Sequence, residues 1–243
     1  MKLLKCISFF FCLSMLSVGF ASCGDDDDED NNKGDGSVSM CKSVIDGRSS
    51  EYKYAYLFLD EENNGEYEYD MYFSNLDLLY YLKQPDEISD NIIGSLFMLA
   101  FESSTVPNGN NLPVGEYASD KYDCEIELDI PIRYLIGEST DDDCPGAVWY
   151  TTWNEQNSNS SPLKISKTSD GMYKVEISEM KLKASEPGVG HIGSDDRDTS
   201  GTFNFIGVPT LVKDSDIDDY TRGITMAGSG KSNKKLVMKL ERK

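Results

Sequence analysis

Apolar and polar side chains alternate along most of the chain after residue 50, and this period of two limits the fold more than any other feature. In residues 66–73, Tyr67, Tyr69, Met71 and Phe73 alternate with Glu66, Glu68, Asp70 and Tyr72. Such alternation predicts strands that bury one face and leave the other in water. We expect strands at residues 52–59, 66–73, 93–101, 126–135, 147–153, 163–167, 173–183, 202–208 and 236–240.

Turn signals connect these strands into an all-β domain. Residues 60–65 end in Asn64-Gly65, residue types that tolerate positive φ, so the first two strands should form a hairpin. The apolar phase slips near Ser178-Glu179, which predicts a β-bulge. Only residues 75–83 have a helical pattern, and Pro85 should end that helix. We predict an antiparallel β-sandwich, with a β-barrel as the alternative, because alternation cannot distinguish the two.

The N-terminus has the composition of a cleaved export signal. Residues 1–21 carry only Lys2 and Lys5 as charges, and their apolar stretch is interrupted by serine and glycine. It is too short and too polar to remain as a membrane span, which is typical of a signal peptide. Cys23 follows two small residues and precedes a glycine and a run of acids.

The segment from Phe20 to Asp30 resembles the lipobox and acidic export signal of Bacteroidetes surface lipoproteins, although Phe20 stands where leucine, valine or isoleucine is usual. The resemblance implies cleavage before Cys23, acylation of Cys23 and display on the outer leaflet of the outer membrane. The alternative is an ordinary secretory signal followed by a solvated acidic tail. The export signal implied by this resemblance comprises Gly24, Asp25, Asp26, Asp27 and Asp28.

Composition then divides the chain into three parts. Residues 1–22 are the signal peptide, and residues 23–50 are expected to be a lipidated, acidic and disordered tether because they are poor in apolar side chains. Residues 51–243 suit one all-β domain. The formal net charge of −20 makes nucleic acid an unfavourable partner, so the membrane, through Cys23, and an extracellular glycan or surface protein are the expected partners.

Three short motifs resemble a pattern that recurs in Bacteroidetes lipoproteins of β-sandwich type. They are Leu112-Pro113-Val114-Gly115-Glu116-Tyr117, Ser169-Asp170-Gly171-Met172-Tyr173-Lys174-Val175 and Ser200-Gly201-Thr202-Phe203. The resemblance implies a fold and a location. It implies no activity.

Three cysteines remain once Cys23 carries lipid. We expect a disulfide between Cys124 and Cys144, because Cys41 falls in the expected tether and the oxidising envelope permits a bond that contributes roughly 3 kcal/mol. Three unpaired thiols are the alternative, since a domain of this size does not need a disulfide.

The residues offer little for catalysis or metal binding. His191 is the only histidine and lies in a glycine-rich loop, so we expect it to be a solvated side chain and not a catalytic base. The segment 228–232 imitates part of a phosphate-binding loop without the required preceding glycine. The acidic clusters at 141–143 and 214–219 lack an EF-hand pattern and are interpreted as solvated loops. We therefore predict a protein with no catalytic residues, no metal and no cofactor.

The best recognition feature is the pair Trp149 and Trp153. On one strand they would share a face and could stack against a sugar ring, with polar residues 154–157 beside them. Packing in the core is the alternative role for both side chains. The sequence predicts a non-enzymatic surface lipoprotein that binds carbohydrate or another extracellular ligand. A structural or adhesion component of a surface assembly is the second hypothesis, and a glycoside hydrolase is the third.

Overall fold

The computed structural model describes residues 36–59, 65–84, 87–89, 91–135, 148–152, 159–185 and 197–213. These residues belong to one compact unit. Its strands are β1 (Ser37–Ile45), β2 (Arg48–Glu51), β3 (Tyr54–Leu59), β4 (Tyr67–Ser74), β5 (Ile93–Ser103), β6 (Gly115–Tyr117), β7 (Tyr122–Pro131), β8 (Val148–Thr151), β9 (Leu163–Lys167), β10 (Tyr173–Ser185), β11 (Arg197–Val208) and β12 (Thr210–Leu211). The helical elements are α1 (Leu78–Lys83), α2 (Ile132–Leu135) and the short 3-10 turn η2 (Ser119–Lys121).

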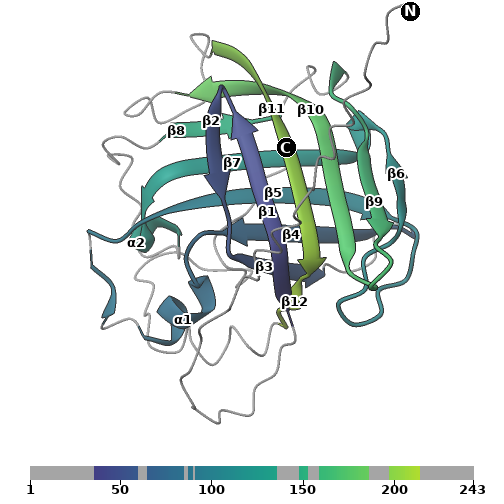
Figure 1. The fold of residues 1–243 in the computed structure, drawn as a ribbon, viewed down its shortest axis with the longest axis horizontal. Helices are drawn as coiled ribbons and strands as arrows, with labels where there is room; N and C mark the ends of the chain where they lie inside the picture. The colour runs from purple at the N-terminus through teal and green to yellow at the C-terminus, as the bar shows by residue number, and fades with distance from the viewer. Residues whose placement is uncertain are drawn as a thin grey trace, which may run out of the picture. The chain divides into compact units, whose positions relative to one another are not determined.

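The strands form one continuous sheet in the order β12-β3-β4-β5-β7-β8-β10-β11-β1-β2, with β9 paired to β10 and β6 paired to β9. Every pair is antiparallel except β12 with β3. The sheet curls into a half-barrel, and in Figure 1 β1, β10 and β11 run steeply in front of β4, β5 and β7, which run nearly horizontally. The prediction of a single all-β domain is confirmed, and the curl of one sheet resembles the barrel alternative.

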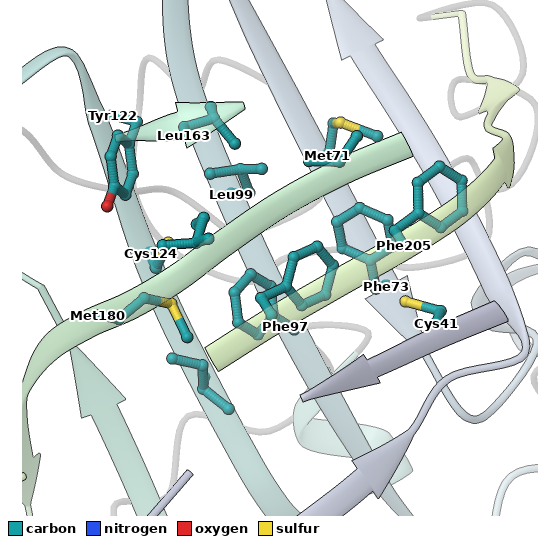
Figure 2. Close-up of a cluster of buried hydrophobic side chains, with 14 of the residues drawn as sticks. Cys41, Met71, Phe73, Phe97, Leu99, Tyr122, Cys124, Leu163, Met180 and Phe205 are labelled. Atoms are coloured by element: carbon teal, nitrogen blue, oxygen red, sulfur yellow. The ribbon is translucent and has the colours of Figure 1, made fainter. Parts of the chain in front are cut away.

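The main core fills the space inside the curl. Phe73 and Phe97 come from β4 and β5, and Phe203 and Phe205 come from β11 on the opposite side. The ring centroids of Phe97 and Phe203 are 4.1 Å apart, and those of Phe73 and Phe205 are 5.1 Å apart. Figure 2 shows Phe73, Phe97 and Phe205 directed toward one another between the strands. Aromatic side chains therefore join the two sides of the sheet.

The opposite side of β3, β4, β5 and β7, which we call the outer face, carries a smaller apolar cluster. Tyr56, Tyr72 and Met98 contribute from the strands, and Leu78 and Leu82 contribute from α1. Asp77 caps α1 by accepting a hydrogen bond from the Tyr80 N–H. The helix ends at Lys83, before Pro85, as the sequence predicts. Within the part of the chain that the structure describes, neither helix has the length and apolar character that a membrane crossing needs.

Two local features expected from the sequence, a hairpin and a β-bulge, are present. Strands β3 and β4 pair as neighbours in an antiparallel hairpin. The pairing of β10 with β11 shifts between Ile177 and Met180, which places the bulge at the predicted Ser178-Glu179. The predicted strand at 236–240 lies outside the described residues.

The expected tether over residues 23–50 is wrong from residue 37 onward, because β1 and β2 occupy this part of the chain. Strand β1 pairs along its length with β11, and Cys41 and Ile45 are buried in the main core. Ser43, which lies between them on the same face, is buried as well, so every second residue from Cys41 to Ile45 points into the core. The predicted strand 126–135 also ends early, since α2 begins at Ile132.

Candidate functional site

A tight turn between β1 and β2 places an aspartate at one end of the sheet. Asp46 has φ 50° and Gly47 has φ 77°, so both central residues of this two-residue turn have positive φ. This is the geometry that Asp-Gly favours in a β-hairpin. The Asp46 N–H donates to the Ser200 carbonyl at 3.0 Å, which fixes the turn against β11.

The Asp46 carboxylate binds two side chains from the start of β11. The Arg197 guanidinium donates to both Asp46 oxygens, with Nη1 3.1 Å from Oδ1. The Thr199 hydroxyl donates to Oδ1, also at 3.1 Å. These hydrogen bonds lower the pKa of Asp46, with the bond from Arg197 as the largest cause. Asp46 is therefore held as a carboxylate by residues more than 150 positions away.

A second arginine and aspartate meet beside this pair. Arg48 Nη2 lies 2.5 Å from Asp129 Oδ2. Asp129 has φ 59° and lies within an irregularity where the pairing of β7 with β5 shifts, between Glu127 and Ile130. The bulge turns Asp129 out of the regular alternation of β7. Asp46 and Asp129 are the two non-glycine residues with positive φ in the described ranges.

Tyr150 of β8 connects the two pairs. Its ring is buried in the main core, and Arg48 lies close enough to its hydroxyl to influence its pKa. Burial raises the pKa of Tyr150, the nearby Asp46 raises it further, and Arg48 and Arg197 oppose the shift. The Tyr150 hydroxyl therefore lies within the electrostatic reach of both arginines and of Asp46. We call Asp46, Arg48, Asp129, Tyr150, Arg197 and Thr199 the Arg–Asp cluster.

The Arg–Asp cluster offers donors and acceptors to a ligand at fixed positions. The side chains of Arg48 and Arg197 are 50% and 60% exposed, and that of Asp129 is 51% exposed. Carboxylates accept hydrogen bonds and guanidiniums donate them in a planar fork, so adjacent hydroxyl groups could bridge the pairs. The same pairs also have a structural role, because they join β1 and β2 to β7 and β11.

The predicted tryptophan platform is only partly covered by the structure. The backbone of Trp149 lies in β8, opposite Glu127 of β7 and Ser185 of β10. Strand β8 ends at Thr151, and Thr152 is held to β7 because the Cys124 N–H donates to its hydroxyl at 2.8 Å. Trp149 is thus adjacent in β8 to Tyr150 of the Arg–Asp cluster. Its side chain, and all of Trp153, lie outside the described residues, so the platform stays a prediction.

The cysteine predictions have mixed outcomes. Cys41 does not lie in a tether but is buried in β1, and burial raises the pKa of its thiol. Cys124 is fully buried in β7 with a free thiol, and its expected partner Cys144 lies outside the described residues. Thiols with raised pKa values react slowly, so neither described cysteine suits catalysis.

Several other predicted features also fall outside the described residues: Cys23, Gly24, Asp25, Asp26, Asp27, Asp28, His191, the acidic clusters at 141–143 and 214–219, and the loop at 228–232. Among the residues that are described, no group of three or more histidine, cysteine or acidic side chains is arranged to hold a metal ion.

One carboxyl group has an unusual environment. Glu125 of β7 lies on the outer face, and burial raises its pKa to about 7. A carboxyl with a raised pKa is one of the two that glycoside hydrolysis requires. The other requirement is a partner carboxylate across a substrate cleft, whereas Glu125 lies opposite the buried Met98 of β5.

Sequence reasoning missed the Arg–Asp cluster because its members come from five strands or turns far apart in the chain. One signal was available: Asp46-Gly47 stands between two β-branched residues and a polar pair, the local pattern of a hairpin turn. Because residues 23–50 were assigned to a tether, this hairpin turn was not predicted. Comparison with protein-family models, curated proteins and solved structures finds no match for this chain.

Proposed function

We propose that this chain is a lipoprotein anchored in the outer membrane through Cys23, whose β-domain binds an extracellular ligand, with carbohydrate as the first candidate. The domain performs no chemistry of its own in this proposal. The observation that carries it is the Arg–Asp cluster, where the partly exposed Asp46, Arg48 and Arg197 lie within electrostatic reach of Tyr150.

Three properties of the Arg–Asp cluster support sugar binding. It is electrically balanced, with two arginines and two aspartates, which suits neutral hydroxyl groups better than a strongly charged ligand. Its backbone is fixed by a tight turn and a bulge, so little conformational entropy is lost when a ligand binds. It also contains a phenolic ring, Tyr150, and an aromatic ring beside polar groups is the usual composition of a small-ligand site.

The binding test uses the two tryptophans as reporters. We expect the fluorescence of the purified full chain to shift on titration with one or more members of a panel of plant and host polysaccharides. Replacing Arg197 by glutamine should weaken that binding tenfold or more, because Asp46 then loses its bidentate partner. An Arg48→Gln variant should behave similarly through Asp129 and Tyr150.

A matched control separates binding from folding. Lys164→Gln removes an exposed ion pair with Glu116 on strands away from the cluster and should leave the affinity unchanged. Exposed pairs contribute little to stability, so these variants should remain folded by circular dichroism. The binding proposal fails if no polysaccharide shifts the fluorescence, or if the Arg197→Gln and Lys164→Gln variants bind equally well.

The anchoring test concerns Cys23. In cells, we expect a Cys23→Ala variant to lose incorporation of labelled palmitate and to leave the membrane fraction, because the acyl chains supply the membrane affinity. A Cys41→Ala variant, which changes a buried thiol, should keep the label. Protease treatment of intact cells then reports surface exposure. Membrane retention of unlabelled Cys23→Ala protein would contradict the lipid anchor.

The second hypothesis, a component of a surface assembly, has less support from the sheet edges. The terminal strands β12 and β2 have two and four residues, and β2 reads Arg-Ser-Ser-Glu. Short polar edges are poor templates for adding a strand from another molecule. The hydrolase hypothesis is supported only by the raised pKa of Glu125.

A further inference from the structure

An aspartate or asparagine that precedes a glycine can react with its own backbone. Glycine has no side chain to shield its nitrogen, so this nitrogen can attack the preceding side-chain carbonyl carbon and close a five-membered ring. Three such pairs have both residues described: Asp46-Gly47, Asn108-Gly109 and Asp170-Gly171. The structure gives the three pairs different environments, which determine how readily each pair reacts.

Both aspartates of these pairs are held as carboxylates by hydrogen bonds. The Asp46 carboxylate accepts from the Arg197 guanidinium. The Asp170 carboxylate accepts from the Thr168 hydroxyl. Each bond is the largest cause of a lowered pKa in its carboxyl group, and an ionised carboxylate is a poor electrophile. The nucleophile of the Asp170 pair is engaged as well, because the Gly171 N–H donates to the Thr168 carbonyl at 3.1 Å.

The Asn108 pair has neither restraint. The Asn108 side chain is exposed, carries an uncharged amide, and makes no hydrogen bond among the described residues. The Gly109 N–H also has no acceptor within the described ranges. Gly109 has φ 59°, and apart from its chain neighbours no atom lies within 4 Å of the position that a Cβ would take. Both reacting groups are therefore free and accessible to water.

We propose that Asn108 deamidates spontaneously in the folded protein. The Gly109 nitrogen forms a bond to Cγ of Asn108, and the side-chain nitrogen leaves as ammonia with the proton of the Gly109 N–H. Water then opens the resulting succinimide at one of its two carbonyl carbons. Opening at Cγ gives aspartate. Opening at the main-chain carbonyl gives isoaspartate, in which the chain continues through Cβ and Cγ of residue 108.

The isoaspartate product changes a turn that Asn108 holds together. The Asn108 carbonyl accepts from the Asn111 N–H at 3.2 Å and from the Asn111 side-chain nitrogen at 2.7 Å. The Asn111 side-chain oxygen accepts from the hydroxyl of Tyr173 in β10 at 2.8 Å. In isoaspartate this carbonyl becomes a carboxylate outside the main chain, and the main chain is one carbon longer. The turn then loses its acceptor for Asn111, and with it the link to β10.

The first test is peptide mapping by mass spectrometry of the purified full chain after incubation in mildly alkaline buffer. We expect aspartate and isoaspartate to accumulate at position 108 at least tenfold faster than at Asn110 and Asn111, because the residues after these two carry side chains. In a Gly109→Asn variant the reaction at Asn108 should slow at least tenfold, since the new Cβ crowds the nitrogen. Asparagine tolerates the positive φ at this position, so the turn should keep its conformation.

An Asn108→Asp variant compares the three environments with the chemistry held constant. All three described pairs are then aspartate followed by glycine. Isoaspartate is measured at each position by labelling with a methyltransferase specific for this residue. We expect it to form at position 108 at least tenfold faster than at Asp46 or Asp170, because only those two carboxylates are held by hydrogen bonds.

Hydrogen exchange tests the structural consequence. The modified protein carries an additional negative charge and can be separated from the parent protein by anion exchange. We expect residues 104–114 of the isoaspartate form to exchange faster than in the parent protein, with β4 and β5 unchanged. A Tyr173→Phe variant lacks the same link to Asn111 and should show the same local increase without any modification.

Three outcomes would overturn the proposal. If Asn108 stays intact in the native protein and reacts only after unfolding in urea, the folded turn protects it. Equal rates at the three pairs of the Asn108→Asp variant would show that the hydrogen bonds at Asp46 and Asp170 give no protection. Unchanged hydrogen exchange in the isoaspartate form would remove the effect on the turn. The reaction uses no residue of the Arg–Asp cluster, so these results are independent of ligand binding there.

Discussion

Replacing Phe97 by alanine is expected to lower the free energy of unfolding by about 3–5 kcal/mol, the range measured for buried phenylalanines. Phe97 is fully buried in β5 and contacts rings from three other segments. Its neighbours are Tyr52, Phe73 and Phe203. The neighbouring rings cannot move into the space left by the Phe97 ring without shifting their strands, so a cavity should remain. Guanidinium denaturation followed by circular dichroism measures the change.

Val106 provides the control for that loss. Its side chain is 67% exposed, and Val106→Ala should change the free energy of unfolding by less than about 0.5 kcal/mol. If Phe97→Ala costs no more than the control, the two sides of the sheet are not joined through this ring. The second largest effect that we expect comes from the charge of a buried carboxyl group and not from the volume of a side chain.

A Glu125→Gln variant should be more stable than the parent protein above pH 7, by up to about 3 kcal/mol. Burial raises the pKa of Glu125 from 4.5 to about 7. Between these values the folded protein keeps a proton that the unfolded chain releases, so the stability of the parent protein falls as the pH rises from 4.5 to 7. Each pKa unit corresponds to about 1.4 kcal/mol, which sets the upper limit. Glutamine does not titrate and should remove this dependence.

The measurement is the difference in free energy of unfolding between variant and parent at pH 4, 6 and 8. We expect little difference at pH 4 and the full difference at pH 8. Glu116→Gln, an exposed substitution on β6, serves as the control and should give a pH-independent difference near zero. A Glu125→Gln variant that is less stable than the parent at pH 8 would show that the carboxylate is stabilised by a cation.

Local pattern predicted most of the strands because alternation is a property of neighbouring residues. The segment 163–167 matches β9 at both ends, and the slip at Ser178-Glu179 matches the bulge in β10. Boundaries were less accurate. Strand β7 ends at Pro131 and residues 132–135 turn into α2, because an apolar run alone does not distinguish a strand from a short helix.

The first strand was missed for a different reason. Residues 37–45 contain five apolar side chains and no acidic one, but the composition of residues 23–50 taken as a whole is dominated by the acidic segment before them. Their inward positions Cys41 and Ile45 are stabilised by the pairing with β11, which is more than 150 residues away. The order of this strand therefore depends on tertiary pairing as well as on its own sequence.

The Arg–Asp cluster could not be predicted from spacing, because Asp46 and Arg197 are 151 positions apart and neither belongs to a known motif. The aromatic pair was the visible feature, yet Tyr150 between the two tryptophans is the residue that connects the cluster to the core.

The sequence alone determined the all-β class, the strand periodicity, the acidic charge and the resemblance to a lipoprotein signal, since each depends on composition or on near neighbours. Tertiary structure decided the rest. The order of strands in the sheet, the burial of β1, and the meeting of Arg48 and Arg197 around Tyr150 all depend on which distant strands pair. Alternation with a period of two shows which side chains of a strand share a face. It does not show which other strand will lie beside it.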